Sequence, residues 1–536
     1  MSKAKMKILF KSFLTATLLM FLTVSTAYAT NYYVAKTGSN ANAGTLAAPW
    51  LTIGKAASTL APGDTVFVRS GTYNEHITPA VSGSATSKIL YKEYPGDTVV
   101  IDGTGTVGWD WDGVFSLVNR NYIEISGFRI INSRGFGIFA SNSHNLGIYS
   151  NSTYNTGMSG IWIGDNSYSV TVDANEIEHS NTLPNQEALS ISGSHDVAVS
   201  HNIVHDGLKE GIDAKGSYNV QIFGNTVYDM TGMGIYVDSY LNTPLNIQIY
   251  NNVVRDTKVG SGYYSSRDGI MLAAESGNYI DGVNIYNNII YNIAGTGILL
   301  SHFHSSGPLP QHKNTKIYNN TIHRSSLAGS GYGGVNIQGA SNSNVLVRNN
   351  ILSRAGTFNI VATSGTTISH NLFFSGSTSG TNYVIGNPLF VTEGSNFHLQ
   401  STSPAINVAL TSGAPVSDFD GNARPQGMAL DMGAFEYLVA GTPPTAPTLT
   451  FPTISNLPTY TWKCIPSASS YQLYVDDSSG NRIAQWYSDA EVNQGGGNCA
   501  YTSNVALNSG IGAWRVRGYN AYGYGDWSTV WNFTVQ

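Results

Sequence analysis

Short hydrophobic segments, each interrupted by an asparagine, recur through the middle of the chain. In residues 218–230, YNVQIFGNTVYDM, apolar and polar positions alternate on both sides of the asparagine. This period of two predicts strands that each bury one face. The repeated asparagines, separated by 27, 23, 27, 36, 32 and 30 residues, are Asn175, Asn202, Asn225, Asn252, Asn288, Asn320 and Asn350. Because a repeat of about this length is typical of a solenoid, each copy is expected to form one coil.

A second strand aligns in every coil on a small residue that precedes it. The aligned segments are GIFA (137–140), GIWI (160–163), ALSI (188–191), GIDA (211–214), GIYV (234–237), GIML (269–272), GILL (297–300) and GVNI (334–337). The alternation places Ile212, Ile235, Ile270 and Ile298 inside and the following residues outside. The asparagines then stack as an inward ladder of side-chain amides, which assigns them to the architecture rather than to catalysis.

The segments on either side of the coils predict further parts. Residues 1–29, with four lysines, an apolar run and Ala27-Tyr28-Ala29, are typical of a secretory signal. Residues 30–105, with an amphipathic helix at 52–60, predict a cap and the first coils, and residues 401–438 close a solenoid that extends over 106–438. After a Pro-rich linker at 439–447, residues 448–536 alternate like the strands of a β-sandwich of fibronectin III type. Buried core is the favoured interpretation of its tryptophans, and a carbohydrate-binding face is the alternative.

Charge and cysteine content narrow the possible partners. Without the signal lysines, 23 basic residues face 33 acidic ones, a net charge of about −10. A general nucleic-acid-binding role is excluded because it needs a basic face. We expect an exported monomer without a membrane span, located in the medium, on the cell surface or in the periplasm. In such a compartment, Cys464 and Cys499 are predicted to form a disulfide.

Three parts of the sequence resemble the right-handed parallel β-helix proteins of the pectate lyase type. They are the repeated coils, the N-terminal stretch YYVAKTGSNANAGTLAAPWLTIGKAASTLAPGDTVFVRSGTYNE and the closing stretch SPAINVA…DFDGNARPQG…DMGAFEY. The resemblance covers roughly residues 31–438 and implies a right-handed parallel β-helix. Together with the sandwich predicted from the pattern of residues 448–536, the expected fold class is all-β, a right-handed parallel β-helix solenoid followed by a small β-sandwich. The resemblance also implies work on a polysaccharide, although the fold hosts lyases, hydrolases, epimerases and adhesins.

Ionisable residues concentrate on a few consecutive coils of an otherwise uncharged exterior. Neighbouring coils lie about 4.8 Å apart, so Asp213 and Lys215 should lie beside Tyr236 and Asp238. The column just before the strands reads Glu187, Glu210, Met233 and Asp268.

Such a group of residues suits β-elimination on a uronic acid, which needs a base, an acid and a neutraliser of the uronate carboxylate. Lys215 with a lowered pKa is the candidate base, Tyr236 the candidate acid and Asp238 a further candidate catalytic residue. Carboxylates select calcium, and the candidate ligands of a Ca²⁺ cofactor are Glu187, Glu210, Asp213 and Asp268. The candidate binding residues for an extracellular polysaccharide are Trp162, Tyr263, Tyr264 and Arg267.

The run from Glu210 to Asn219 is similar to the motif of alginate lyases and chondroitinase B. There a calcium-binding glutamate precedes the catalytic lysine by five residues, as Glu210 precedes Lys215, with serine and asparagine following. This chain departs from the motif at Tyr236, where the family carries an arginine.

Two other functions fit the same residues. A glycoside hydrolase would use a carboxylate pair drawn from Glu187, Glu210, Asp213, Asp238 and Asp268. In a non-catalytic binding or adhesion solenoid, Lys215 between Asp213 and Asp238 is an ordinary charge ladder with a raised pKa.

Overall fold

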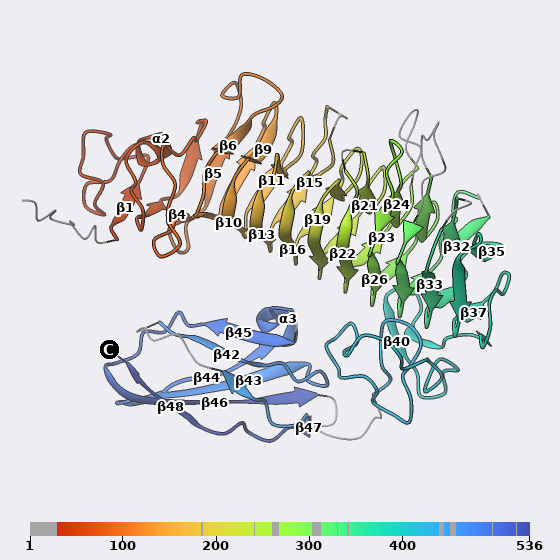
Figure 1. Cartoon of the computed structure of the whole chain (residues 1–536). Helices are drawn as coiled ribbons and strands as arrows, with labels where there is room; N and C mark the ends of the chain where they lie inside the picture. Colours follow the sequence, from red (N-terminus) through yellow and green to blue (C-terminus); the bar gives the residue numbers. More distant parts are fainter. Residues whose placement is uncertain are drawn as a thin grey trace, which may run out of the picture.

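The chain forms a long solenoid and a small β-sandwich (Figure 1). The computed structural model describes residues 29–183, 186–240, 242–259, 267–302, 312–329, 331–339, 342–438, 444–450, 457–495, 497–520 and 523–535. The predicted signal at 1–29 lies outside these residues except for Ala29, as do Tyr263, Tyr264 and part of the predicted linker.

Three parallel sheets form the solenoid, and from β6 onward most coils contribute a strand to each of them, whereas the first coils contribute none to the third sheet. The first contains β1 (Asn31–Val34), β2 (Thr65–Val68), β4 (Ile89–Glu93), β7 (Ile123–Ser126), β10 (His144–Tyr149), β13 (Tyr168–Asp173), β16 (His195–Ser200), β19 (Tyr218–Phe223), β22 (Leu245–Tyr250), β25 (Ile280–Asp281), β26 (Asn284–Tyr286), β29 (His312–Lys313), β30 (Lys316–Tyr318), β33 (Val345–Arg348) and β36 (Thr366–Ser369). The second contains β3 (Gly71–Tyr73), β5 (Val99–Asp102), β8 (Phe128–Ile131), β11 (Ser152–Tyr154), β14 (Glu176–Glu178), β17 (Ile203–His205), β20 (Thr226–Tyr228), β23 (Val253–Arg255), β27 (Ile289–Tyr291), β31 (Thr321–His323), β34 (Ile351–Ser353), β37 (Leu372–Phe374) and β38 (Val384–Ile385).

The third sheet carries the segments aligned by their small residues. It contains β6 (Gly113–Val118), β9 (Phe136–Ser141), β12 (Ile161–Gly164), β15 (Leu189–Ser192), β18 (Ile212–Lys215), β21 (Ile235–Asp238), β24 (Ile270–Ala273), β28 (Ile298–Ser301), β32 (Tyr332–Ile337) and β35 (Phe358–Val361). The predicted parallel β-helix is confirmed.

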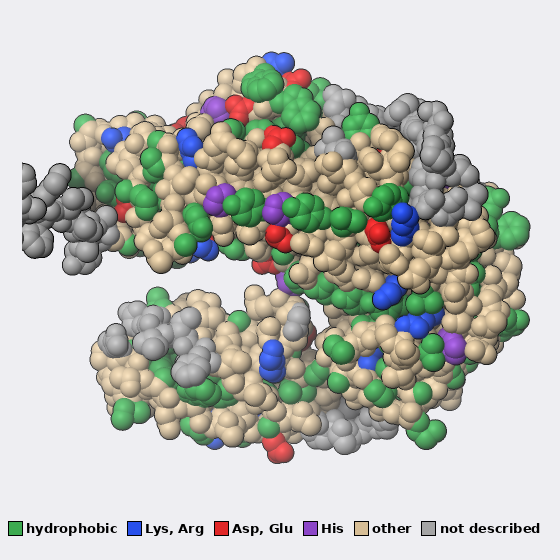
Figure 2. All heavy atoms as spheres, in the orientation of Figure 1, with side chains coloured by type: hydrophobic (Ala, Val, Ile, Leu, Met, Phe, Trp, Pro, Cys, Tyr) green, Lys and Arg blue, Asp and Glu red, His purple; other side chains and the backbone are tan. Residues whose placement is uncertain are grey.

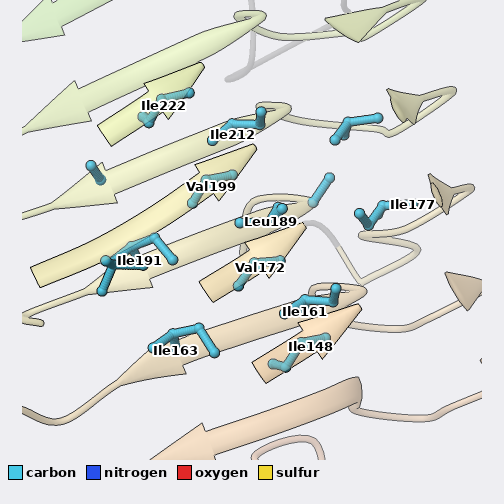
Figure 3. Packing of buried hydrophobic residues seen from close by; sticks show 14 of the residues in the cluster. Ile148, Ile161, Ile163, Val172, Ile177, Leu189, Ile191, Val199, Ile212 and Ile222 are labelled. Atoms are coloured by element: carbon cyan, nitrogen blue, oxygen red, sulfur yellow. The ribbon is translucent and has the colours of Figure 1, made fainter. Parts of the chain in front are cut away.

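The inside of the solenoid is filled by aliphatic side chains stacked from coil to coil (Figure 3). Ile161, Leu189 and Ile212 occupy matching positions of successive strands and are fully buried. The asparagine ladder is also present and runs from Asn151 to Asn371, longer at both ends than predicted. Each amide bonds the next, with Asn225 Nδ2 donating to Asn252 Oδ1 at 3.0 Å.

A row of rings on the exterior of the first sheet follows the same coil-to-coil register. His144, Tyr168, His195 and Tyr218 stack with centroids 4.6, 5.1 and 4.5 Å apart. Figure 2 shows a line of hydrophobic and histidine side chains along one face of the solenoid. Because the rings cover one another's faces, this row stabilises neighbouring coils rather than offering a flat surface to a ligand.

The N-terminal helix α2 (Ile53–Ala57) is shorter than the predicted 52–60. Thr52 caps its start by accepting a hydrogen bond from Lys55 N. The hydroxyls of Ser58 and Thr59 both donate to Lys55 O, so they end the helix by bonding locally to the backbone.

The closing segment folds back along the asparagine ladder after the hairpin β39 (Phe390–Thr392) and β40 (Asn396–Leu399). Asn287, Asn319 and Asn349 donate to its backbone carbonyls. The side chain of Arg424 is fully buried and donates a hydrogen bond to Glu436 of the same segment, which stabilises the segment internally.

The C-terminal domain packs a three-stranded sheet on a five-stranded one. The first contains β41 (Leu449–Thr450), β42 (Thr459–Lys463) and β45 (Asn498–Thr502), and the second β43 (Ser470–Asp477), β44 (Gly480–Ser488), β46 (Gly510–Asn520), β47 (Gly523–Tyr524) and β48 (Trp531–Val535). Helix α3 (Asp489–Val492) links β44 to β45. The sandwich is present, and its fibronectin III type stays a prediction.

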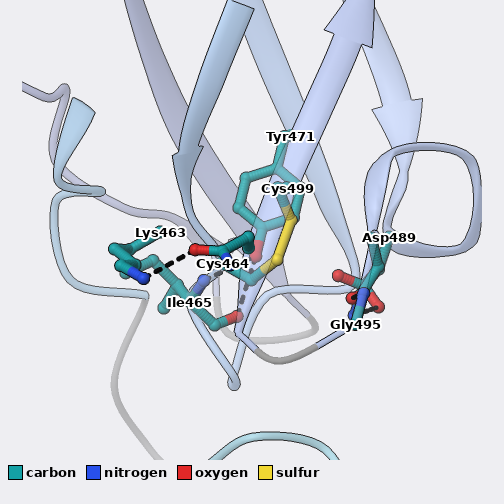
Figure 4. The surroundings of a disulfide bond; sticks show 9 residues. Lys463, Cys464, Ile465, Tyr471, Asp489, Gly495 and Cys499 are labelled. Atoms are coloured by element: carbon teal, nitrogen blue, oxygen red, sulfur yellow. Dashed lines mark hydrogen bonds between the residues drawn. A yellow bond between two sulfur atoms is a disulfide. The ribbon is translucent and has the colours of Figure 1, made fainter. Parts of the chain in front are cut away.

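Cys464 and Cys499 form a disulfide between the end of β42 and β45 (Figure 4). Beside it, the Tyr471 hydroxyl donates to Ile465 O at 3.0 Å and accepts from Ile465 N at 2.6 Å. The disulfide and these two hydrogen bonds stabilise this end of the sandwich. Among the described residues, no helix has the length and apolar character to cross a membrane.

Candidate active site

The register predicted for the charged coils is observed in the third sheet. Asp213 pairs with Tyr236 and Lys215 with Asp238 across β18 and β21. The preceding column is also in register, because Ala188 N donates to Glu210 O and Gly211 N to Met233 O. The repeat of the solenoid thus brings Glu187, Glu210, Asp213, Lys215 and Asp238 onto one outer face.

Glu187 is the centre of this group. It is fully buried, and its Oε1 accepts hydrogen bonds from Lys209 Nζ at 2.8 Å and Lys215 Nζ at 3.1 Å. Burial by itself would raise the pKa of Glu187, but Lys215 and Lys209 lower it to about 2. Glu187 is therefore a buried anion.

Lys215 lies among three carboxylates. Besides Glu187, its Nζ is 3.5 Å from Asp238 Oδ2 and 3.9 Å from Asp213 Oδ2. Burial by itself would lower the pKa of Lys215, but these three carboxylates together raise it above its ordinary value. The lowered pKa expected of a base is therefore wrong for this arrangement, in which Lys215 is a cation.

The remaining acids have raised pKa values chiefly because they are buried, and neighbouring carboxylates add to the effect. Burial, opposed by Lys215 and reinforced by Glu275, raises the pKa of Asp238 to about 7. Burial and the nearby Glu187 raise the pKa of Asp213 well above its usual range, and burial also raises that of Glu210. Four carboxyl groups share two lysines in the ion pairs of this site. The site therefore has a surplus of negative charge that either binds protons or attracts a cation.

The chemistry of these residues fits a calcium ion in part. Glu187 Oε2 and Asp213 Oδ1 are buried and accept no hydrogen bond within the described part of the chain, and carboxylate oxygens are the ligands that calcium prefers. Among the described residues, however, no three of these oxygens lie within 4.8 Å of one another. The donors are present, but they converge less closely than in a complete calcium site.

Asp268 has different neighbours from the other predicted ligands. It is buried, and its Oδ1 accepts a hydrogen bond from Thr296 N at 2.6 Å, which orders the next coil. Burial raises the pKa of Asp268, although the hydrogen bonds from Thr296 and the charge of Arg267 oppose this shift. Neither Asp268 nor Arg267 takes part in an ion pair among the described residues.

Tyr236 donates a hydrogen bond from its hydroxyl to Glu275 Oε1. Burial, together with Asp238 and Glu275, raises the pKa of Tyr236 well above its ordinary value, so the phenol keeps its proton. Sequence reasoning missed Glu275, which lies in the turn after β24, and Lys209, which directly precedes Glu210. The position of Lys209 next to Glu210 in the charged column could have indicated its role. Glu275 lies outside the repeated strands, so the repeat gave no indication of its position.

Trp162 is 3% exposed and stacks on Phe139 with centroids 4.8 Å apart. Its ring covers Gly164, where a Cβ atom would lie 2.1 Å from the indole. The prediction that Trp162 binds the polysaccharide is therefore wrong for this arrangement, because the ring is covered and cannot stack on a sugar. The loop before β6 covers it with Trp111, which is 42% exposed, while Trp109 in the same loop is 59% exposed.

Comparison with known proteins places parts of the chain beside carbohydrate-active β-helices. Residues 32–196 match the family described as "Pel9A-like, right handed beta helix region", and residues 280–406 match "Disaggregatase related". The first match includes Glu187 and ends before Asp213 and Lys215.

Two curated relatives and one solved structure illustrate the similarity. The uncharacterized protein YwoF of Bacillus subtilis (strain 168) is 25% identical over 388 residues, which cover 64% of this chain and 79% of YwoF. Pectate lyase PEL9 of Emericella nidulans is 30% identical over 124 residues, covering 21% of this chain and 30% of PEL9. The crystal structure of pectate lyase Pel9A aligns with a TM-score of 0.48 at 15% identity, covering 77% of this chain and 97% of Pel9A.

Proposed function

We propose that the protein is an exported polysaccharide lyase that cleaves a uronic-acid-containing polymer, such as pectate or alginate, by calcium-assisted β-elimination. The observation that carries the proposal is the buried group of carboxylates around Lys215 on the outer face of the solenoid. The local similarity to pectate lyase PEL9 and to the Pel9A-like family supports the same class of reaction.

Each residue of the group has a separate role in the proposed reaction. Glu187, Glu210 and Asp213 would hold calcium, which supplies positive charge to these carboxylates and to the uronate of the substrate. For Lys215 to act as the base, calcium would have to offset the carboxylates that raise its pKa, so that burial, which lowers the pKa, would outweigh them. The neutral amine then takes the proton from the carbon that bears the uronate carboxylate. A carbon–carbon double bond forms, the glycosidic carbon–oxygen bond breaks, and the leaving oxygen takes the proton of Tyr236.

A glycoside hydrolase is the second candidate, and the separation of two pKa values favours it. Glu187, with a pKa of about 2, is an anion at neutral pH, whereas Asp238, with a pKa of about 7, keeps a proton at weakly acidic pH. Two carboxyl groups with opposite protonation states are what acid and base catalysis on a glycosidic bond requires.

The test is incubation of residues 30–536 with pectate, alginate, glucuronan and neutral glucans, with calcium or with a chelator. Elimination is followed by the ultraviolet absorbance of the unsaturated uronate, and hydrolysis by new reducing ends. We expect an absorbance rise on a uronate polymer that the chelator abolishes. New reducing ends without an absorbance rise would contradict the lyase and support the glycoside hydrolase. Binding of a polymer without either product would indicate a non-catalytic solenoid.

A further inference from the structure

The five-stranded sheet of the sandwich carries an aromatic and basic surface on its outer face. We define the aromatic–arginine patch as Tyr474, Trp486, Arg515, Arg517, Tyr524 and Trp527. The core tryptophans, Trp462 and Trp514, are buried, whereas Trp486 is 36% and Tyr524 58% exposed. The favoured interpretation of the tryptophans as core is therefore correct for two of them and wrong for Trp486.

The pairing of neighbouring strands places the residues of the aromatic–arginine patch side by side. Gln472 of β43 pairs with Trp486 on one side and Arg517 on the other, and Tyr474 pairs with Arg515. Because side chains alternate along a strand, Arg515 and Arg517 face outward while Trp514 and Val516 fill the core.

Trp527 lies between the two arginines. Its ring centroid is 4.6 Å from the guanidinium carbon of each, and Tyr524 lies 4.5 Å from that of Arg517. These contacts hold both planar guanidinium groups in fixed orientations beside aromatic rings.

Among the described residues, the two arginines have no carboxylate partner. Within the described part of the chain, no ion pair involves Arg515 or Arg517, whereas Arg69, Arg134 and Arg354 each pair with an acid. The Nε of Arg517 donates to the neutral amide oxygen of Gln472 at 3.0 Å. In a chain with more acidic than basic residues, these two guanidinium groups form a local concentration of positive charge, which attracts anions.

We propose that the aromatic–arginine patch is a binding site for an acidic glycan, a polymer of uronic acids. Aromatic faces stack on sugar rings, and the planar fork of a guanidinium group binds a carboxylate with two parallel hydrogen bonds. The combination of charge and rings selects a uronate polymer over a neutral glucan. The site shares its ligand class with the proposed function but lies on a different domain.

The experiment measures binding without cleavage, so its failure is distinguishable from failure of the proposed catalysis. The full chain carrying Lys215→Met is titrated with polygalacturonate and with a neutral glucan of equal length by calorimetry, in chelator. The same titration is made after adding Arg517→Gln, Arg517→Lys or Trp486→Ala. The matched control is Lys463→Gln, which removes one positive charge from the opposite sheet of the same domain.

We expect the parent to bind the uronate polymer and not the glucan. Arg517→Gln and Trp486→Ala should each weaken binding roughly tenfold, Arg517→Lys should weaken it less, and Lys463→Gln should leave it unchanged. Unchanged binding in the patch variants, or equal affinity for the glucan, would overturn the proposal. If the melting temperature of Arg517→Gln is lower than that of the parent, its binding loss could reflect unfolding. The test then rests on the affinities of the charge-retaining Arg517→Lys and of Trp486→Ala at an exposed position.

Discussion

At the residue scale, the arrangement of charge around Lys215 determines the chemistry of the outer face. The side chain of Lys215 is 19% exposed and that of Glu187 is 1% exposed, so their attraction is screened little by water. Burial and charge act in opposite directions on Lys215, and the carboxylates decide the outcome. Any cation that binds these carboxylates would therefore change the protonation of the lysine.

Replacing Lys215 by Met should destabilise the fold at neutral pH. The change leaves Glu187, Asp213 and Asp238 with less counter-charge, and breaking a buried ion pair typically costs about 3 kcal/mol. Urea unfolding measures the loss, which should shrink between pH 7 and pH 5 as the surplus carboxyls with raised pKa values take up protons. Lys88→Met, in the exposed pair with Glu124, should cost less than about 1 kcal/mol, and an equal cost in the two variants would contradict this account.

His312 should make the fold sensitive to acid. It is fully buried, its Nε2 donates to Ser301 O at 3.0 Å, and burial lowers its pKa to about 4. Since the unfolded side chain takes up a proton near pH 6.5, stability should fall as the pH drops from about 6.5 to about 4, by up to about 3 kcal/mol. Unfolding of His312→Asn over this range should show a smaller dependence on pH than the parent. An unchanged slope would refute the assignment, and the exposed His179→Asn, which does not contribute to the pKa shift of His312, is the control.

At the scale of elements, the asparagine ladder is a buried polar structure that extends from Asn151 to Asn371. Each rung satisfies backbone groups at the turn between the first and second sheets as well as its neighbouring amides. Asn225, for example, donates to Val199 O at 2.9 Å and accepts from Asn202 N at 2.9 Å. From Asn151 to Asn371, the ladder thus connects each coil to the next at the bend between two sheets.

Asn225→Ala should be strongly destabilising. It leaves the backbone carbonyl of Val199 and the amide of Asn202 buried without partners, and each such group costs about 1–3 kcal/mol. We expect a loss of at least about 3 kcal/mol in urea unfolding. Asn284→Ala, on the half-buried exterior of β26, should lose less than about 1 kcal/mol, and similar losses at both positions would argue against the ladder as a stabilising element.

The repeat in the sequence is enough to predict the coils of the solenoid and the register of their strands. Period-two alternation and the aligned small residues predicted that Asp213 lies beside Tyr236 and Lys215 beside Asp238, because parallel strands of a solenoid stack in register. Loops between the strands follow no repeat, so Glu275 and the cover of Trp162 by Trp111 could not be predicted. The protonation of Lys215 also needed distances and burial, which a pattern does not contain.

At the scale of the whole molecule, the sandwich contacts the side of the solenoid. A cavity of about 240 Å³ lies where they meet, and its lining includes His201 and Phe223 of the solenoid, Phe419 and Asp420 of the closing segment, and Gly495 of the sandwich. Asp173 Oδ1 lies 2.7 Å from His201 Nδ1 and orients the imidazole. The contact therefore depends on a small residue at Gly495.

Gly495→Ala should loosen this contact. A Cβ atom there would lie 2.0 Å from His201 Nε2, and the residue has a φ of +75° that disfavours side chains. Gly497→Ala is the matched control, because it has the same φ in the same loop with nothing within 4 Å of the added atom. Small-angle scattering should show a larger radius for Gly495→Ala only, and equal radii for both variants would show that the contact does not depend on Gly495.

The central claim is that the carboxylate-bound Lys215 performs chemistry on a uronate polymer. The most direct measurement is the initial rate of ultraviolet absorbance on the polymer that the wild-type chain cleaves, for Lys215→Met beside Lys88→Met, with circular dichroism to verify folding. Loss of a catalytic base predicts a fall of at least about a hundredfold for Lys215→Met and an unchanged rate for Lys88→Met. A folded Lys215→Met variant that retains the wild-type rate would contradict the account.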